Sequence, residues 1–221
     1  MGLDLQAFTF LNSTIKKSNY SNLLCIGRQG ISMSQSDKYR LKKIYKIDLG
    51  VNIDYRWADD IFIHHFGISH VSSIDYSPYE GADIIHDLNK KIEIKKKFDL
   101  IIDLGTSEHV FNVYSAFNNY HNLLKTGGTI AHMLPCNSFC GHGLYQFSPS
   151  FFVSLYQKSR GYSLEFIALS EAKNSRYFYQ IEKNNIDDKF VFRGSKPMVI
   201  FVVAKKIANL NFNLIYQGDY I

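Results

Sequence analysis

The chain has 221 residues, 46% of them hydrophobic, which is enough to bury the core of one domain. Its formal net charge is only +5 and its lysine clusters are not interleaved with aromatic residues, so nucleic acid is not expected as a partner. No run of about 18 apolar residues occurs, and the start of the chain lacks a basic stretch with a small-residue cleavage site, so neither a membrane span nor a secretory signal is expected.

The number of cysteines is odd, and their spacing shows no disulfide framework. Cys25, Cys136 and Cys140 therefore indicate a reducing compartment, and we expect a cytoplasmic protein. The sequence leaves the oligomeric state open, with a homodimer as one alternative.

Short apolar runs alternate with amphipathic segments along the chain. This alternation, with glycine-containing turns, is typical of a doubly wound α/β sheet in a single domain over residues 1–221. A helical extension is expected over 1–20, and an insertion over 32–56 that either covers the ligand site or decorates the surface. The last two runs have little between them, which predicts an antiparallel strand at one end of the sheet. Strands are expected at 22–26, 71–74, 82–85, 100–102, 129–134, 164–169 and 198–203, and helices at 36–47, 58–66, 109–124 and 148–159.

A glycine-containing turn follows the first expected strand. Gly27 lets a ligand approach the backbone closely, and the N–H groups of Arg28 and Gln29 that follow can bind its polar atoms. A tight turn without a ligand is the alternative. The turn does not match the GxGxxG pattern of dinucleotide sites, which argues against NAD.

Aspartates stand at the ends of three successive expected strands. Asp75, Asp87 and Asp103 each follow an apolar run, and the carboxyl edge of an open α/β sheet is where ligands bind. A carboxylate at Asp75 can accept both ribose hydroxyls of a nucleoside. For Asp87 a solvent-facing turn is the alternative, but three such acids in order favour one shared site.

An acid and an imidazole open the segment after the strand at 100–102. His109 is the first candidate for a catalytic base, because a helix N-terminus disfavours imidazolium and so favours a neutral imidazole. A packed or capping histidine is the alternative. Glu108 either contacts the substrate, hydrogen-bonds the cofactor or backbone, or completes a helix cap.

The loop after the strand at 129–134 carries polar side chains between two glycines. It lies at the carboxyl edge and is expected to face the substrate. His142 is the second candidate for the base. The residues expected to contact substrate here are Asn137, His142, Tyr145 and Gln146.

The same region offers a Cys₂His₂ set, which is the alternative of a zinc site. His132, Cys136, Cys140 and His142 carry suitable ligand types, but His132 lies in a buried strand and the two cysteines lack a remote partner pair. We therefore expect no metal site.

Five segments carry a resemblance to a known family: LLCIGRQG, SSIDYSPYEGADIIHDLN, FDLIIDLGTSEHVFN, LLKTGGTIAHMLP and GHGLYQFSPSFF, over roughly residues 20–155. In order and spacing they resemble bacterial class I S-adenosylmethionine-dependent methyltransferases. The resemblance implies a Rossmann-like sheet of about seven strands, mostly parallel with an antiparallel strand near one edge, and S-adenosylmethionine as methyl donor. The YEGA with HDLN, GTSEHVFN and GHGLYQFSP signatures look like a branch associated with surface polysaccharides and other small-molecule pathways.

The resemblance also implies which residues hold the cofactor. Asp75 would accept from the ribose hydroxyls, Asp87 from the adenine amino group, and Asp103 would lie near the methionine end. The first turn departs from the family motif, because Cys25 and Gln29 stand where the motif has an acid and a second glycine. The expected cofactor-binding residues are Gly27, Arg28, Gln29, Asp75, Tyr76, Asp87, Leu88, Asp103 and Gly105.

The expected function is transfer of a methyl group to an oxygen or nitrogen of a small-molecule acceptor. A sugar or phosphoramidate precursor of a capsule or surface polysaccharide fits the branch that the signatures resemble. Two alternatives stay open: a catalytically silent cofactor-binding partner subunit, and an NAD-dependent or nucleotide-sugar enzyme, against which the missing GxGxxG argues.

Overall fold

The part of the chain that the structure describes contains eight strands, which include all seven that the sequence predicts. The structure is a computed structural model, and it describes residues 2–15, 20–49, 56–182 and 195–216. The additional strand, β7, is two residues long and lies in a segment where no strand was predicted. The strands are β1 (Asn22–Ile26), β2 (His70–Asp75), β3 (Ile84–Ile85), β4 (Phe98–Asp103), β5 (Leu124–Asn137), β6 (Tyr162–Glu171), β7 (Tyr179–Gln180) and β8 (Met198–Lys206).

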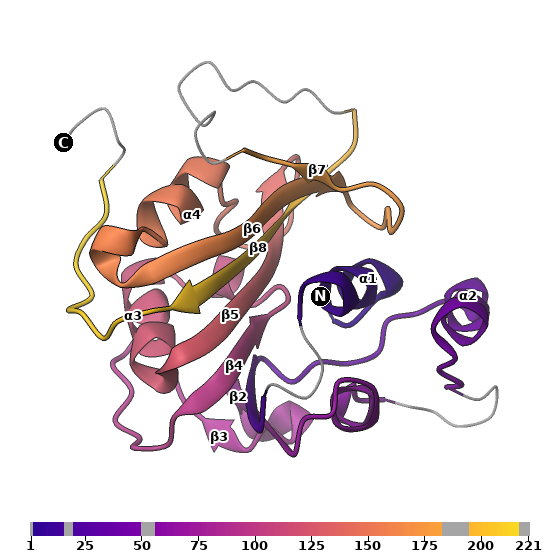
Figure 1. Cartoon of the computed structure of the whole chain (residues 1–221), viewed down its shortest axis with the longest axis horizontal. Coiled ribbons are helices and arrows are strands. Elements are labelled where there is room, and N and C mark those ends of the chain that lie inside the picture. The colour runs from indigo at the N-terminus through magenta and orange to yellow at the C-terminus, as the bar shows by residue number, and fades with distance from the viewer. Residues whose placement is uncertain (1, 16–19, 50–55, 183–194, 217–221) are drawn as a thin grey trace.

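These strands form one sheet in the order β3-β2-β1-β4-β5-β8-β6-β7. Neighbouring strands among β1 to β5 pair in parallel, whereas β8 runs antiparallel to both β5 and β6, and β7 runs antiparallel to β6. In Figure 1 the yellow β8 lies between β5 and the orange β6. The predicted fold class, a mostly parallel doubly wound sheet with an antiparallel strand near one edge, is confirmed.

The helices follow the predicted order, with shorter extents. The expected helix at 109–124 begins only at Val113, because Asn112 is its N-cap and accepts a hydrogen bond from the Ser115 N–H. The segment expected as a helix at 58–66 contains a short π-helical turn. The helical elements are α1 (Leu5–Thr14), α2 (Gln35–Tyr45), η1 (Ile61–His65), η2 (Pro78–Glu80), η3 (Ser107–His109), α3 (Val113–Leu123), α4 (Pro149–Leu155) and η4 (Lys158–Arg160).

Both faces of the sheet are covered, because alternate residues of each buried strand point to opposite sides. In β1, Leu24 and Ile26 pack in one core with α3 and α4, whereas Leu23 and Cys25 pack in a second core with α1 and η1. Figure 1 shows α1 on the opposite side of the sheet from α3 and α4. This two-layer cover leaves the carboxyl ends of the central strands as the open edge.

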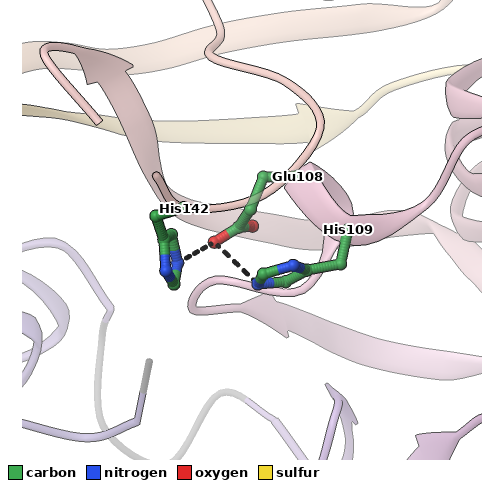
Figure 2. Close-up of side chains that lie close together, drawn as sticks. All are labelled: Glu108, His109 and His142. Atoms are coloured by element: carbon green, nitrogen blue, oxygen red, sulfur yellow. Dashed lines mark hydrogen bonds and ion pairs between the residues drawn. The ribbon is translucent and has the colours of Figure 1, made fainter. Parts of the chain in front are cut away.

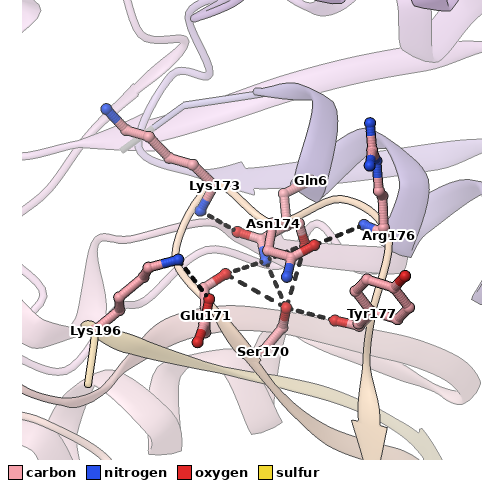
Figure 3. Close-up of polar contacts among 8 residues, drawn as sticks. All are labelled: Gln6, Ser170, Glu171, Lys173, Asn174, Arg176, Tyr177 and Lys196. Carbon is pink, nitrogen blue, oxygen red and sulfur yellow. Dashed lines mark hydrogen bonds and ion pairs between the residues drawn. The ribbon is translucent and has the colours of Figure 1, made fainter. Parts of the chain in front are cut away.

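The expected N-terminal helical extension is present as α1, and one buried side chain ties it to β6. The Gln6 amide group donates to the Ser170 hydroxyl at 3.0 Å and to the backbone carbonyls of Glu171 and Asn174 at 2.8 Å each. Its oxygen accepts from the Lys173 N–H at 2.9 Å. Figure 3 shows these contacts converging on Gln6. The extension is therefore packed into the domain.

The insertion predicted over 32–56 contains α2, and its residues 50–55 lie outside the described residues. A reciprocal pair of hydrogen bonds between Ser34 and Asp37 caps α2, and Leu41 is its buried residue.

None of the described helices is both long and apolar enough to cross a membrane.

Candidate functional site

A cavity of about 450 Å³ lies at the carboxyl ends of β1, β2 and β4, which are neighbours in the sheet. Eight of the nine expected cofactor residues line it: Gly27, Arg28, Gln29, Asp75, Tyr76, Asp87, Leu88 and Gly105. His109, a candidate base, lines it as well. Six further lining residues were not expected at the site, although five of them lie within the YEGA, HDLN and GTSEHVFN segments: Ile74, Glu80, His86, Asn89, Thr106 and Val110.

The turn after β1 has a backbone that side chains hold in place. Gly27 has φ +71°, a conformation that favours glycine. The Gln29 amide nitrogen donates to the carbonyls of Ile26 and Gly27, both at 3.0 Å, and the Thr106 hydroxyl donates to Ile26 at 2.8 Å. The buried Gln29 Oε1 has no hydrogen-bond partner in the described chain. Gln29 thus fixes the backbone of the turn that lines the cavity.

Arg28 joins three segments around the rim of the cavity. Its guanidinium donates to the backbone carbonyls of Glu80 and Gly81, each at 3.0 Å, and forms an ion pair with Asp59 at 3.0 Å. It also stacks over the Trp57 ring, 4.5 Å from the ring centroid. The planar, forked donor set of arginine suits several acceptors at once.

The two expected nucleoside-binding acids lie at the ends of β2 and β3. The Asp75 carboxylate accepts from the Tyr76 N–H at 2.6 Å. The Asp87 carboxylate accepts from the Asn89 side-chain amide at 2.8 Å and from its N–H at 3.0 Å. These hydrogen bonds from Asn89 lower the pKa of Asp87, so its carboxylate is ionised at neutral pH. Both acids therefore offer acceptor oxygens to a ligand in the cavity.

Asp103 does not line the cavity, which corrects the expectation that it contacts the methionine end of a cofactor. Its side chain has no solvent exposure, and it accepts from the Ser107 hydroxyl at 2.5 Å and the Thr106 N–H at 3.1 Å. It shares the α3 side of the sheet with Ile101, two residues earlier on the same strand. Through these hydrogen bonds Asp103 stabilises the position of η3.

Glu108, His109 and His142 form a cluster beside the cavity (Figure 2). The buried Glu108 Oε1 lies 3.3 Å from His142 Nε2 and 3.8 Å from His109 Nε2. The two imidazole rings stand edge to face with centroids 4.9 Å apart. The two histidines that the sequence offered as alternative bases are therefore neighbours.

The environment of this cluster perturbs its titratable groups. Burial, with a further contribution from nearby Asp103, raises the pKa of Glu108 to about 8. Burial and the neighbouring His142 lower the pKa of His109. The expectation that a helix N-terminus keeps His109 neutral is corrected, because α3 begins four residues later.

The loop after β5 is fastened to η3. The carbonyl of Glu108 accepts from the Leu144 N–H at 2.7 Å and the Tyr145 N–H at 3.2 Å. The Tyr145 hydroxyl donates to the Phe111 carbonyl at 2.8 Å, and Gln146 accepts from the Phe139 N–H at 2.8 Å. Tyr145 and Gln146 thus use polar atoms to hold the loop, and the contact of these residues and the exposed Asn137 with substrate stays a prediction.

The Cys₂His₂ set does not assemble. His132 is buried, and its two ring nitrogens contact the Asp103 carboxylate and the Tyr156 hydroxyl. Both ring nitrogens of His132 are therefore already occupied inside the fold and do not join Cys136, Cys140 and His142 in a metal site.

The sequence left open whether the insertion over 32–56 covers the ligand site or decorates the surface. Its described residues, 32–49 and 56, do not line the cavity. The segment carries α2 at the surface, where Tyr39 and Ile44 are exposed.

No protein-family model matches the sequence, and no curated protein sequence matches it. Solved structures do resemble it. An O-methyltransferase from a trans-AT polyketide synthase multienzyme of Brevibacillus brevis, solved with S-adenosyl-L-homocysteine, has a TM-score of 0.55 at 12% identity, over 94% of this chain and 73% of that chain. A putative methyltransferase of Bacillus halodurans has a TM-score of 0.54 at 13% identity, over 94% of this chain and 100% of that chain.

A putative methyltransferase of Haloferax volcanii, solved with a methyltransferase activator, has a TM-score of 0.50 at 11% identity, over 91% of this chain and 89% of that chain. Each of these proteins shares the layered arrangement described above. The chain therefore has the Rossmann-like fold seen in these methyltransferase structures.

Proposed function

We propose that the chain is an S-adenosylmethionine-dependent methyltransferase that acts on an oxygen or nitrogen of a small molecule. The observation that carries the proposal is the cavity that brings Asp75 and Asp87 together with the Gly27 turn at one edge of the sheet. Its volume falls in the range of about 300–1,000 Å³ that is usual for small-molecule sites. The Brevibacillus neighbour, which holds the demethylated cofactor, has the same fold.

The residues of the cavity suit a nucleoside with an amino-acid tail. The Asp75 carboxylate would accept from the ribose hydroxyls and Asp87 from the adenine amino group. The backbone at Gly27 would give room for the methionine end. The cofactor would supply an electrophilic sulfonium methyl.

The protein's contribution to transfer is alignment and proton removal. The acceptor's lone pair forms the new bond to the methyl carbon while the carbon–sulfur bond breaks and its electron pair stays on sulfur. An acceptor that bears a proton must also lose it. His109 lines the cavity and His142 contacts His109, which supports placing the acceptor on the side of the cavity next to the cluster with Glu108.

The acceptor class is proposed as a small molecule with a hydroxyl or amine. Sugar and phosphoramidate precursors of surface polysaccharides stay predictions from the sequence and belong in the acceptor panel. A cytoplasmic location and a homodimer also stay predictions.

Calorimetry with S-adenosylmethionine and S-adenosylhomocysteine tests the cofactor site. Asp75→Ala is expected to weaken binding by more than about 10-fold, because charge-assisted hydrogen bonds contribute about 1.5–3 kcal/mol each. Asp60→Ala, an exposed acid away from this cavity, is the matched control and should bind as the parent does. Equal affinities for the parent and Asp75→Ala, or tight binding of NAD instead, would contradict the proposal.

Turnover distinguishes an enzyme from a silent binding subunit. His109→Ala is expected to depress methyl transfer to the acceptor while leaving cofactor affinity nearly intact. If His142→Ala has this effect and His109→Ala does not, the roles of the two histidines reverse. Cofactor binding without transfer to any hydroxyl or amine acceptor would instead indicate a silent subunit.

A further inference from the structure

The donor atoms of Glu108, His109 and His142 have the spacing of a metal site. The three donor atoms lie within 4.8 Å of one another, and Glu108 Oε1 is 3.3 and 3.8 Å from the two histidine Nε2 atoms. With bonds of about 2.1 Å, neighbouring ligands of a tetrahedral or octahedral ion lie about 3.0–3.4 Å apart. Small side-chain rotations therefore bring all three onto one ion.

The buried carboxylate provides a second, independent indication. Glu108 has no solvent exposure, and its Oε2 has no hydrogen-bond partner among the described residues. A carboxylate in this environment is unfavourable unless it is paired or coordinates a cation. Its ion-pair partners in the described chain are the two histidines, which are themselves good ligands when neutral.

The backbone around the cluster is built to keep the donors together. Gly143 has φ +75°, and a Cβ on it would lie 2.7 Å from Glu108 Cγ. The Glu108 carbonyl accepts from the N–H groups of Leu144 and Tyr145, so the segment that carries His142 is closed directly onto η3. Figure 2 shows His142 and His109 approaching the same Glu108 oxygen from either side.

The outer side of the cluster is open. The side chains of His109 and His142 are 48% and 38% exposed, and His109 also lines the main cavity. Three protein ligands with open positions toward a cavity are typical of catalytic rather than structural metal sites. The ligand types, two imidazoles and one carboxylate, favour a divalent transition-metal ion such as Mn²⁺, Fe²⁺, Co²⁺ or Zn²⁺.

We propose that Glu108, His109 and His142 bind one divalent transition-metal ion, with open coordination positions that face the acceptor side of the cavity. Binding of the metal ion by these residues does not depend on the proposed function. A role of the ion in holding the acceptor does rest on the proposed function. An acceptor oxygen bound to the ion would be oriented toward the methyl group and would release its proton to water more readily. The histidines would then be ligands rather than proton acceptors.

Titration of the chelator-treated full chain with Co²⁺, followed by calorimetry and visible absorption, tests the site. One ion per chain is expected, with absorption bands of a protein-bound ion. Glu108→Gln, which keeps the size of the side chain, and His142→Ala should weaken binding by more than about 100-fold, because loss of outer-shell partners alone costs about 10–100-fold. His70→Ala, an exposed histidine on β2, should bind Co²⁺ as the parent does.

A pair of glycine variants tests whether the close approach of Gly143 to Glu108 keeps the three donor atoms together. Gly143→Ala should lose Co²⁺ affinity because the new methyl group displaces Glu108, whereas a Cβ on Gly141 meets no atom within 4 Å and Gly141→Ala should retain it. Circular dichroism of each variant verifies folding. Absence of Co²⁺ binding to the parent, or equal affinity in Glu108→Gln and the parent, would overturn the proposal.

Calorimetry with S-adenosylmethionine on the same samples separates the two proposals. Cofactor binding without Co²⁺ binding overturns the metal site alone. Co²⁺ binding without cofactor binding supports the metal site and contradicts the proposed methyltransferase. An increase in acceptor turnover on adding Co²⁺ to the parent, absent in Glu108→Gln, would support the role in holding the acceptor, and unchanged turnover would contradict it.

Discussion

The Asp103 carboxylate lies 3.2 Å from Nδ1 of His132, its direct partner across the parallel pair β4 and β5, and both side chains are fully buried. A carboxylate only accepts, so Nδ1 carries the proton, and in the neutral ring Nε2 then accepts from the Tyr156 hydroxyl at 2.6 Å. Ser107 extends the network from Asp103 to the Tyr120 hydroxyl at 3.0 Å. The network thus joins the sheet to α3, the end of α4 and η3, the element that also carries Glu108.

Removing the imidazole should destabilise the fold. His132→Leu leaves Asp103 and the Tyr156 hydroxyl buried without that partner, and we expect the free energy of unfolding to fall by about 2–4 kcal/mol. Urea denaturation measures it. His70→Ala, at the exposed start of β2, should change stability far less, and equal losses in the two variants would show that the network is not stabilising.

The turn at Gly27 should be intolerant of any side chain. Gly27→Ala places a Cβ 2.6 Å from the Thr106 hydroxyl, in addition to the cost of about 1–2 kcal/mol for a left-handed alanine. Gly127→Ala has the same backbone cost at φ +85° but meets no atom within 4 Å. We expect Gly27→Ala to be the less stable of the two in urea.

Affinity for the cofactor should also differ between the Gly27→Ala and Gly127→Ala variants. Gly27→Ala is expected to weaken S-adenosylmethionine binding by about 10-fold or more, or about 1.4 kcal/mol. Gly127 lies away from the cavity, so its variant should bind normally. If calorimetry finds equal affinities, the turn does not contact the cofactor.

Stability should fall on mild acidification because of His121. Burial and nearby Lys206 lower the pKa of His121 to about 4, from an ordinary value of 6.5. Between these values the unfolded chain binds a proton that the folded chain does not, so this contribution to stability is present above pH 6.5 and is lost as the pH falls toward 4. The slope is up to about 1.4 kcal/mol per pH unit.

Unfolding free energies of the parent and His121→Gln across this pH range isolate the effect. Glutamine is uncharged and can still hydrogen-bond the Tyr162 hydroxyl, which contacts His121 Nδ1 at 2.8 Å. The variant should therefore lose less stability than the parent on acidification. Parallel pH profiles for the two proteins would assign the acid sensitivity to other groups.

The packing of α1 on β6 should depend on Gln6. Gln6→Ala removes a side chain that is 1% exposed together with its hydrogen bonds to β6 and the turn that follows it, so a loss of about 2 kcal/mol or more is expected. Arg176→Ala alters an exposed side chain of the same region (Figure 3) and is the matched control. A loss no larger than that of Arg176→Ala would mean that the Gln6 hydrogen bonds contribute little to stability.

The sequence alone predicted the sheet and the edge at which the cavity lies, because a buried parallel strand requires an apolar run and its end is marked where polar residues resume. Asp75 and Asp87 were expected at this edge and line its cavity. Asp103 follows the same pattern, yet its side chain turns into the fold. Its burial comes with a partner on the neighbouring strand, His132 of β5, and no pattern within one segment identifies that partner.

The tertiary structure alone decided the relation between the two histidines. The sequence offered His109 and His142 as alternatives because they lie on different segments, and it expected no metal site. Backbone hydrogen bonds from Leu144 and Tyr145 close the second segment onto Glu108. Local propensities predict segments one at a time, whereas the meeting of Glu108 and His142, 34 positions apart, follows from how the loop after β5 folds back over η3.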